Sequence, residues 1–300
     1  MSVRVLQFGT TGQVGAELVR QTAAHPELEI TALSRAECDF ADPEKAARLV
    51  VEAKPDLVVI AAAYTAVDEA ESEPELCWEV NAGTPAAIAG AAGPNGPAIV
   101  HFSTDYVFDG EKASAYTEDD PTEPASAYGR FKLQGERTLM ASTARALVLR
   151  TSWVVSAHGR NFVKTMLRLA ADGKPLRVVD DQFGRPTSAA DLARFVLSRA
   201  EGLAAAPAGD PRFGLFHFAN AGETTWRRFA EAIVEEAYGV DAPKVEPITT
   251  ADYPTPARRP VRSTLDTAKL ERVFGHHPRP WREALGEIVA DLKAKERISA

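Results

Sequence analysis

The chain has 300 residues, of which 45% are hydrophobic and 25% are charged, a composition typical of a globular protein with one large domain or two smaller ones. Its 20 Gly and 20 Pro are scattered without a period, which excludes a collagen-like or low-complexity chain. The formal net charge of −8, from 34 Lys and Arg against 42 Asp and Glu, gives no general attraction to a polyphosphate backbone, so nucleic acid is not an expected partner.

Cysteine content and hydropathy predict a soluble protein of the cytoplasm. The two cysteines, Cys38 and Cys77, are too few for a disulfide framework and indicate a reducing compartment. The apolar run at residues 3–8 ends at Gly9 and is too short for the apolar region of a signal peptide. The longest mostly apolar stretch, Leu57–Val67, falls far below the roughly 20 residues that span a bilayer. We therefore expect no membrane association.

In the first half of the chain, short apolar runs alternate with segments of helical periodicity. The predicted strands are Val3–Phe8, Glu29–Leu33, Leu57–Ala61, Ile99–Phe102 and Ala146–Leu149. The first predicted helices are Gln13–Ala23 and Pro43–Ala53, with Asp42 as the N-cap of the second. Strands that are apolar on both faces and joined by helices are typical of a parallel sheet covered on two sides. The sequence predicts an α/β fold with a Rossmann-type, doubly wound parallel sheet.

After Trp153 the alternation loosens, and we expect a smaller, mixed α/β domain that binds the substrate. Its predicted helices are Asn161–Ala171, Asp191–Ala200 and Thr225–Tyr238, and no internal repeat is visible. We assign residues 1–153 to a dinucleotide-binding domain and residues 154–300 mainly to the substrate domain. The strand-like run Leu215–Phe218 predicts that parts of 188–220 rejoin the first domain, so the boundary is interleaved.

A glycine loop lies between the first predicted strand and the first predicted helix. Gly9, Gly12 and Gly15 follow the spacing G-x-x-G-x-x-G. Glycines at these steps allow a tight turn, a close approach of the backbone to a pyrophosphate and close packing of helix on strand. The helix N-terminus then offers free N–H groups to the phosphates. A plain turn is the alternative, but the strand before the loop and the helix after it favour a dinucleotide site.

Tyr128 and Lys132 are four residues apart, which places them on one face if the segment is helical. An ammonium group at ~4 Å, with an effective dielectric constant of ~20, would favour the phenolate by up to about 4 kcal/mol before desolvation is subtracted. We therefore expect Lys132 to lower the pKa of Tyr128 toward the range of a general acid–base. Alone, such a pair is more often a solvated helix face.

Thr104 strengthens the catalytic interpretation of that pair. It follows the predicted strand Ile99–Phe102, so it lies at the carboxyl end of a strand, where open α/β sheets bind their ligands. A hydroxyl there can hydrogen-bond a substrate carbonyl oxygen. The alternative is that Thr104 is only a turn residue.

Further segments carry a resemblance over essentially the whole chain. They are Ala61–Asp68, Ser103–Phe108, Arg150–Val154, Asn161–Val163, Asp181–Thr187 and Tyr253–Pro256, the last of which leads to Arg259 and Pro260. With the glycine loop and Tyr-x-x-x-Lys, the chain resembles the extended short-chain dehydrogenase/reductase superfamily. More narrowly, it resembles the family of dTDP-4-dehydrorhamnose reductases.

The resemblance implies roles for matching positions. The catalytic residues would be Thr104, Tyr128 and Lys132, with Tyr128 and Lys132 also contacting the cofactor. The cofactor would be bound by the glycine loop (Gly9, Thr11, Gly12, Gln13, Val14 and Gly15), by Ser34, Arg35, Asp39 and Phe40 near the adenosine, and by Ala61, Ala62, Ala63, Tyr64 and Thr65. The substrate would be bound by Thr104, Asp105, Tyr106, Trp153 and Arg259, with Arg259 at the diphosphate. Trp153 as a core aromatic and Arg259 as a surface residue are the alternatives.

The end of the second predicted strand departs from the NAD-type pattern. An acidic residue usually binds the ribose 2′-hydroxyl there, whereas this chain has Ser34 and Arg35. A hydroxyl and a guanidinium suit a 2′-phosphate, so we expect NADPH to be preferred, with NADH possible through Asp39. Some relatives hold magnesium at a dimer interface, but no convincing carboxylate set is visible here. We therefore assign no metal ligands, and the use of a magnesium ion and the choice between a monomer and a homodimer stay open.

The resemblance implies reduction of the C4 keto group of dTDP-4-dehydro-L-rhamnose, the last step of dTDP-rhamnose biosynthesis. Two alternatives stay open. The chain could reduce a different nucleotide 4-keto-sugar, or it could be a non-catalytic regulatory subunit with the same fold. The intact Tyr128 and Lys132 argue against the second alternative.

Overall fold

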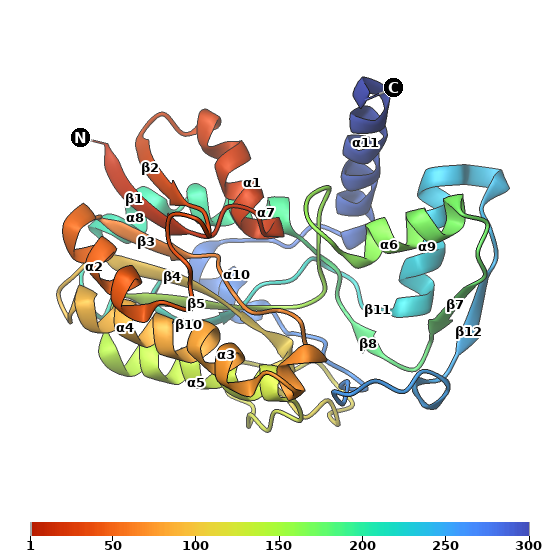
Figure 1. The fold of residues 1–300 in the computed structure, drawn as a ribbon, viewed down its shortest axis with the longest axis horizontal. Helices are drawn as coiled ribbons and strands as arrows, with labels where there is room; N and C mark the ends of the chain where they lie inside the picture. Colours follow the sequence, from red (N-terminus) through yellow and green to blue (C-terminus); the bar gives the residue numbers. More distant parts are fainter. Residues whose placement is uncertain (1, 300) are drawn as a thin grey trace.

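The computed structural model describes residues 2–299, with side chains described through residue 294. Its centre is a six-stranded sheet in the order β10-β5-β4-β3-β1-β2, and every neighbouring pair is parallel. The strands are β1 (Val3–Phe8), β2 (Leu28–Leu33), β3 (Leu57–Ile60), β4 (Ala98–Thr104), β5 (Ala146–Thr151) and β10 (Gly214–His217). The sheet and its helices form the left-hand part of Figure 1. This confirms the predicted Rossmann-type α/β fold.

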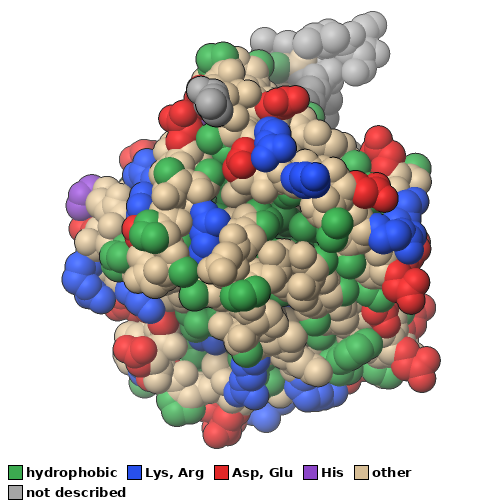
Figure 2. All heavy atoms as spheres, turned by 90° about the vertical axis from the view of Figure 1, so that its left-hand side faces the viewer, with side chains coloured by type: hydrophobic (Ala, Val, Ile, Leu, Met, Phe, Trp, Pro, Cys, Tyr) green, Lys and Arg blue, Asp and Glu red, His purple; other side chains and the backbone are tan. Residues whose placement is uncertain are grey.

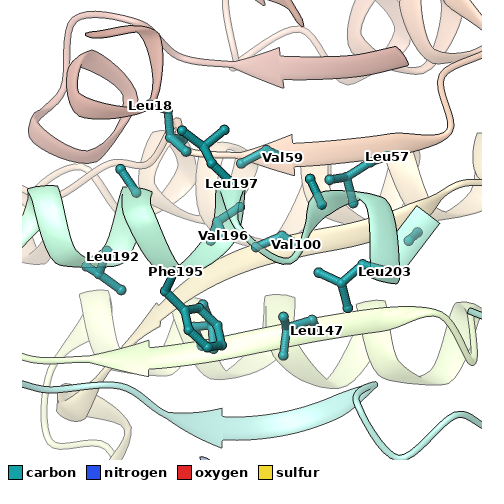
Figure 3. Close-up of a cluster of buried hydrophobic side chains, with 14 of the residues drawn as sticks. Leu18, Leu57, Val59, Val100, Leu147, Leu192, Phe195, Val196, Leu197 and Leu203 are labelled. Carbon is teal, nitrogen blue, oxygen red and sulfur yellow. The ribbon is translucent and has the colours of Figure 1, made fainter. Parts of the chain in front are cut away.

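Helices cover both faces of the sheet because its strands are apolar on both sides. One face is covered by α1 (Gln13–Gln21), α7 (Ala189–Leu197), α8 (Ala200–Ala205) and α10 (Ala268–Phe274). The other is covered by α2 (Pro43–Ala53), α4 (Thr84–Ala92) and α5 (Ala127–Ser142). Along β3, Leu57 and Val59 face the first set, whereas Val58 and Ile60 face the second. Figure 3 shows Val59, Val100 and Leu147 meeting Phe195 and Val196 of α7.

A second, smaller group of elements packs around its own apolar cluster at the right of Figure 1. Its helices are α6 (Phe162–Ala171), α9 (Trp226–Tyr238) and α11 (Trp281–Ser299). Its strand pairs are β7 (Leu176–Val179) with β12 (Val245–Ile248), β8 (Phe183–Gly184) with β11 (Thr224–Thr225), and β6 (Val154–Val155) with β9 (Thr187–Ser188). Phe229 and Ile233 of α9 are fully buried in this cluster.

The predicted elements of the first half agree closely with the structure. The helix expected at Gln13–Ala23 ends at Gln21 and continues as a 3-10 turn through Ala24. Asp42 caps α2 as expected, because its Oδ1 accepts a hydrogen bond of 2.9 Å from the backbone N–H of Lys45. Leu215 and Phe216 lie in β10, which pairs with β5 at the edge of the central sheet.

The surface and the helices add two observations. On the face seen in Figure 2, Lys and Arg side chains are intermixed with Asp and Glu rather than gathered by sign. No helix in the described part of the chain combines the length and the apolar character that crossing a bilayer requires.

Candidate active site

The glycine loop joins β1 to α1, and each of its glycines has a different reason to lack a side chain. Gly9 has a φ of 92°, and a Cβ there would lie 2.8 Å from the backbone nitrogen of Ala62. A Cβ on Gly15 would overlap the carbonyl oxygen of Gly9, so this glycine lets α1 pack against the loop. A Cβ on Gly12 would meet nothing within 4 Å. The open space therefore lies at Gly12, in front of the N-terminus of α1, where a phosphate would bind.

The topology places this loop at the point where the strand order reverses. β1 lies between β2 and β3, so the connections that leave β1 and β3 run in opposite directions across the sheet. Ligands of open α/β sheets bind in the crevice that this reversal creates. Ala61, Ala62 and Ala63 follow β3 directly at this crevice, and the backbone of Ala61 bonds to that of Phe8 at 2.9 Å.

The Gln13 side chain joins the loop to the smaller group of elements. Its Nε2 donates to the carbonyl oxygen of Val154 at 2.8 Å, and its Oε1 accepts from the hydroxyl of Ser156 at 3.0 Å. The side chain is therefore occupied, and the backbone N–H groups of Gln13 and Val14, in the first turn of α1, are the groups left for a pyrophosphate.

Tyr64 is held by a residue that sequence reasoning missed. Asn81 accepts a hydrogen bond from the backbone N–H of Tyr64 at 3.1 Å and donates to its carbonyl oxygen at 2.9 Å. Asn81 is fully buried in a π-helical turn, Glu79–Gly83, and such turns occur often at functional sites. Burial, and then a hydrogen bond of 2.7 Å that the phenol donates to Glu73, raise the pKa of Tyr64 to about 12. Thr65 follows in the same loop.

The residues predicted near the adenosine divide into exposed and buried ones. Arg35 is exposed, and its guanidinium lies 3.4 Å from the carboxylate of Asp39. The backbone N–H of Ser34 donates to Glu37 at 2.8 Å. Phe40, by contrast, is buried, and its ring packs against Phe8 with 5.6 Å between ring centroids. The Phe40 side chain thus belongs to the core under the loop.

Helix α5 brings Tyr128 and Lys132 to the carboxyl end of β4. Ser126 caps the helix by accepting a hydrogen bond of 3.2 Å from the N–H of Gly129. A Cβ on Gly129 would overlap the carbonyl oxygen of Tyr106, so this glycine lets the helix approach the loop that follows β4. Tyr128 and Lys132 are both buried on the same helix face, one turn apart.

Thr104, Asp105 and Tyr106 surround the phenol of Tyr128. Thr104 ends β4, and its hydroxyl donates to Oδ1 of Asp105 at 3.1 Å and lies close enough to the phenol of Tyr128 to lower its pKa slightly. The ring of Tyr106 meets that of Tyr128 edge to face, with 5.8 Å between centroids. The structure therefore brings these four residues together in one buried site.

The expected lowering of the Tyr128 pKa by Lys132 is wrong. Burial of the phenol, the largest cause, instead raises the pKa of Tyr128 well above its usual value. The ammonium of Lys132 is held at the sheet by the carbonyl oxygen of Phe102, 2.7 Å away, and by Nε2 of His101, 3.2 Å away. Burial lowers the pKa of Lys132 to about 8, while the charge of Glu136 acts to raise it.

Asp105 is almost fully buried, and this burial raises the pKa of its carboxyl to about 7. The nearby hydroxyls of Ser263 and Thr104 act to lower it. Its second oxygen, Oδ2, has no hydrogen-bond partner in the described part of the chain. A buried oxygen without a partner next to Thr104 and Tyr128 is suited to accept a hydrogen bond from a bound hydroxyl.

Arg259 contacts the site from a distant segment, whereas Trp153 packs in the smaller group of elements, as the core-aromatic alternative expects. Trp153 has a φ of 47°, uncommon for a residue with a side chain, and its ring stacks on Trp226 with 3.7 Å between centroids. Arg259 donates to Asp68 at 2.6 Å and lies 5.9 Å from the centroid of the Tyr106 ring. Its second terminal nitrogen, Nη1, is buried without a hydrogen-bond partner among the residues described. Arg259 is thus tied to the loop after β3 and retains a free donor.

Two further observations complete the site. His101 was also missed, although a lone polar residue in the otherwise apolar strand Ile99–Phe102 is a signal that could have found it. Asn81 has no comparable signal, because its role depends on the long-range contact with Tyr64. Within the residues that the structure describes, no three His, Cys, Asp or Glu side chains gather in a way that could hold a metal ion.

Comparison with known proteins identifies the family. Residues 3–294 match the family model described as the RmlD substrate binding domain. A dTDP-4-dehydrorhamnose reductase from Burkholderia thailandensis is 44% identical over 97% of this chain and 99% of the relative. The enzyme of the same name from Escherichia coli K12 is 42% identical over 97% of this chain and 98% of its own length.

Solved structures agree with the sequence relatives. The crystal structure of a dTDP-4-dehydrorhamnose reductase from Clostridium acetobutylicum has a TM-score of 0.88 and 37% identity, covering 97% of this chain and 99% of that one. The Bacillus anthracis enzyme of that name, solved in complex with NADP, has a TM-score of 0.88 and 31% identity over 97% of this chain and 100% of its own. With matches that run from end to end, this chain belongs to the RmlD substrate binding domain family.

Proposed function

We propose that this chain is an NADPH-dependent reductase that converts the C4 keto group of dTDP-4-dehydro-L-rhamnose to the hydroxyl of dTDP-L-rhamnose. One observation carries the proposal: Tyr128, Thr104 and Asp105 meet in a buried site at the carboxyl end of β4, on the sheet edge that also holds the glycine loop. The full-length relatives named dTDP-4-dehydrorhamnose reductase support the sugar nucleotide and the reaction.

The glycine loop fits the dinucleotide. The space at Gly12 and the free N–H groups at the start of α1 suit a pyrophosphate, and Ala61–Ala63 lie across the crevice. Arg35 is exposed beside Asp39, where its donors suit a 2′-phosphate, and a relative has been solved with NADP. Related structures of lower identity are described with NAD, so NADH remains a second cofactor.

The bound dinucleotide would supply a hydride to C4 of the sugar. Tyr128 donates its phenolic proton to the carbonyl oxygen as that oxygen becomes an alkoxide. Because burial raises the pKa of Tyr128, the phenol keeps its proton at neutral pH and is in the form that a reduction requires. Thr104 orients the phenol and the substrate oxygen, and the ammonium of Lys132 stabilises the phenolate that results.

The sugar nucleotide would lie between the carboxyl end of β4 and the smaller group of elements. Asp105 would accept a hydrogen bond from a sugar hydroxyl through its unpartnered Oδ2, with Tyr106 and Trp153 as flat surfaces at the site. Arg259 would donate to the diphosphate from its free Nη1. We infer that residues 154–300, apart from the parts of 188–220 packed on the sheet, form most of the substrate side.

We further infer that the protein acts in the cytoplasm as a monomer or a homodimer. Both cysteines, Cys38 and Cys77, are buried free thiols, as expected in a reducing compartment. Light scattering coupled to gel filtration distinguishes the two assemblies.

The test is turnover of the purified chain with dTDP-4-dehydro-L-rhamnose, followed by loss of NADPH absorbance and by NMR of the sugar product. We expect dTDP-L-rhamnose to form, and Tyr128→Phe to lower kcat by ~10²–10⁴ with little change in the Kd of NADPH. A higher kcat/KM for another nucleotide 4-keto-sugar would identify that compound as the substrate. Binding of cofactor and sugar nucleotide without turnover would favour a regulatory subunit.

A further inference from the structure

His101 is a fully buried histidine in the middle of the central sheet. It lies on β4 between apolar neighbours, its side chain is 1% exposed, and its Nε2 is 3.2 Å from Nζ of Lys132. Polar side chains are rarely placed in such a position unless they bond to a specific partner. The partner here is the lysine of the proposed catalytic group.

The ammonium of Lys132 is held by neutral acceptors rather than by a carboxylate. No salt bridge involves Lys132 in the described part of the chain, and its Nζ donates to the carbonyl oxygen of Phe102 at 2.7 Å. The nearest acid on the same helix, Glu136, is bound by Arg150, with the shortest contact at 2.7 Å. A buried cation without an adjacent anion depends on its hydrogen-bond acceptors.

The contacts of the Lys132 ammonium on the sheet side leave one of its N–H donors free. An ammonium group has three N–H donors and no acceptor. Phe102 and His101 take two of them on the sheet side. The third is left for another acceptor, and Tyr128 lies one turn away on the same face of α5.

The imidazole ring of His101 can accept a hydrogen bond from Lys132 only in its neutral form. Burial, and then the charge of Lys132, lower the pKa of His101 well below its usual value, so the ring stays uncharged. Because Lys132 can only donate, Nε2 is the acceptor and the ring proton lies on Nδ1. Nδ1 has no hydrogen-bond partner among the residues described, so the ring's one bond is the bond to Lys132.

We propose that His101 is a positioning residue, which holds the ammonium of Lys132 so that its third N–H faces the nicotinamide ribose and the phenol of Tyr128. The proposal rests on the proposed function, because it assigns to Lys132 a part in that reaction. His101 itself touches neither substrate nor cofactor and acts through Lys132.

Two replacements separate this role from simple packing. In His101→Leu the acceptor is lost and the volume is roughly kept, whereas the amide oxygen of His101→Gln can replace Nε2. We expect His101→Leu to lower kcat about ten- to a hundredfold, the usual effect of losing a hydrogen bond to a charged group, and His101→Gln to restore most of it. In a Lys132→Met background, adding His101→Leu should change kcat little, because the two residues act as one unit.

The pH profile gives a readout that packing alone would not change. Lys132 is faced by His101 of β4, by Glu136 of its own helix and by Cys77 of α3 (Pro74–Trp78), while Arg150 of β5 binds Glu136. Losing an acceptor for the charged form lowers a lysine pKa. The fall of kcat/KM at high pH, which follows loss of the Lys132 proton, should therefore move to lower pH in His101→Leu and return in His101→Gln.

A second buried histidine provides the matched control. His217 lies in β10, is also fully buried, and bonds to the carbonyl oxygens of Tyr116 and Asp266 rather than to Lys132. His217→Leu should lower the melting temperature without moving the pH profile. If His101→Leu behaves like His217→Leu, or if His101→Gln restores nothing, His101 does not position Lys132.

A readout that needs no sugar keeps the two proposals distinguishable. NMR of lysine labelled with ¹³C at Cε reports the titration of Lys132, assigned by its loss in Lys132→Met. We expect this titration to move to lower pH in His101→Leu even if the parent does not reduce the sugar. An unchanged titration overturns the inference about His101, whereas a shifted titration in a protein without turnover overturns only the proposed function.

Discussion

At the residue scale, several polar atoms of the candidate site are buried and have no hydrogen-bond partner among the described residues. They include Oδ2 of Asp105, Oγ of Ser103 and Oγ1 of Thr151. These residues lie at the carboxyl ends of β4 and β5, where Thr104 and Thr151 are paired in register. Each such atom costs about 1–3 kcal/mol, which a bound ligand with hydroxyl groups would relieve. The site is therefore built at the expense of stability.

Asp105 allows this cost to be measured. Its pKa of about 7 lies above the 3.8 of an unperturbed carboxyl, so the folded protein holds this proton more tightly than the unfolded chain does. The contribution of Asp105 to stability therefore falls as the pH rises toward the folded pKa. We expect the stability of Asp105→Asn relative to the parent to increase by on the order of 2 kcal/mol between about pH 5 and about pH 8. Urea unfolding at both pH values measures it.

The matched control is Asp120→Asn. Asp120 bonds to Lys112 and Thr117, which lowers the pKa of its carboxyl, so it is ionised in both states throughout this range. Its effect on stability should be equal at the two pH values. A constant difference for Asp105→Asn as well would contradict a raised pKa at Asp105.

Arg35 decides the choice of cofactor in our interpretation. Its only ion pair in the described structure, with Asp39 at 3.4 Å, is exposed and worth little, so the guanidinium is free to turn to a 2′-phosphate. We expect Arg35→Ala to weaken NADPH binding about ten- to a hundredfold and to leave NADH binding almost unchanged. Titration calorimetry with both cofactors checks this.

Arg48→Ala is the appropriate comparison for Arg35→Ala. Arg48 is also exposed and faces an acid four residues away, Glu44 at 4.0 Å, but it lies within α2 rather than at the end of β2. This variant should bind both cofactors like the parent. If Arg35→Ala weakens the binding of NADPH and NADH equally, Arg35 does not bind the 2′-phosphate.

At the scale of elements, two short segments of the chain would position the proposed chemistry. The loop between β1 and α1 turns at Gly9 and packs at Gly15, which leaves the N-terminus of α1 open at Gly12. Helix α5 begins at the Ser126 cap and approaches the loop after β4 through Gly129, which places Tyr128 beside Thr104. In both segments a glycine is required for a close backbone approach.

Gly12→Val tests the loop as a ligand site. Gly12 has a φ of −70° and open space around it, so a side chain there should leave the fold intact. The same side chain would occupy the space where the pyrophosphate binds, and we expect the Kd of NADPH to rise at least about a hundredfold. Calorimetry gives the Kd, and thermal melting gives the stability.

Gly15→Ala should behave in the opposite way. Its Cβ would overlap the carbonyl oxygen of Gly9, so we expect a lower melting temperature as the main effect. If the folded Gly12→Val protein binds NADPH like the parent, the pyrophosphate does not bind at this loop.

At the scale of the whole molecule, the proposed site would lie where the sheet and the smaller group of elements are joined. Gln13 of α1 bonds to Val154 at 2.8 Å, and Asp68, after β3, binds Arg259 at 2.6 Å. Arg279 binds Asp191 of α7 at 2.8 Å. Because these contacts link the glycine loop and the loop after β3 to later segments, cofactor and sugar nucleotide would be bound by parts of the chain that are far apart in sequence.

The sequence by itself determined the fold class and the local elements. Short apolar runs ended by glycine or polar residues form buried strands, and Asp42 before Pro43 caps a helix, because these signals act within a few residues. The glycine loop and the spacing of Tyr128 and Lys132 could be recognised in the sequence for the same reason.

Only the tertiary structure decided which groups surround those residues. It placed His101 against Lys132, Asn81 against Tyr64 and Asp68 against Arg259, all pairs distant in the sequence. It also reversed the expected shift of the Tyr128 pKa, since the effect of burial depends on the packing around the phenol and not on the spacing to Lys132. Local periodicity fixes the direction of a side chain along its element, whereas long-range packing sets its partners, its exposure to water and hence its chemistry.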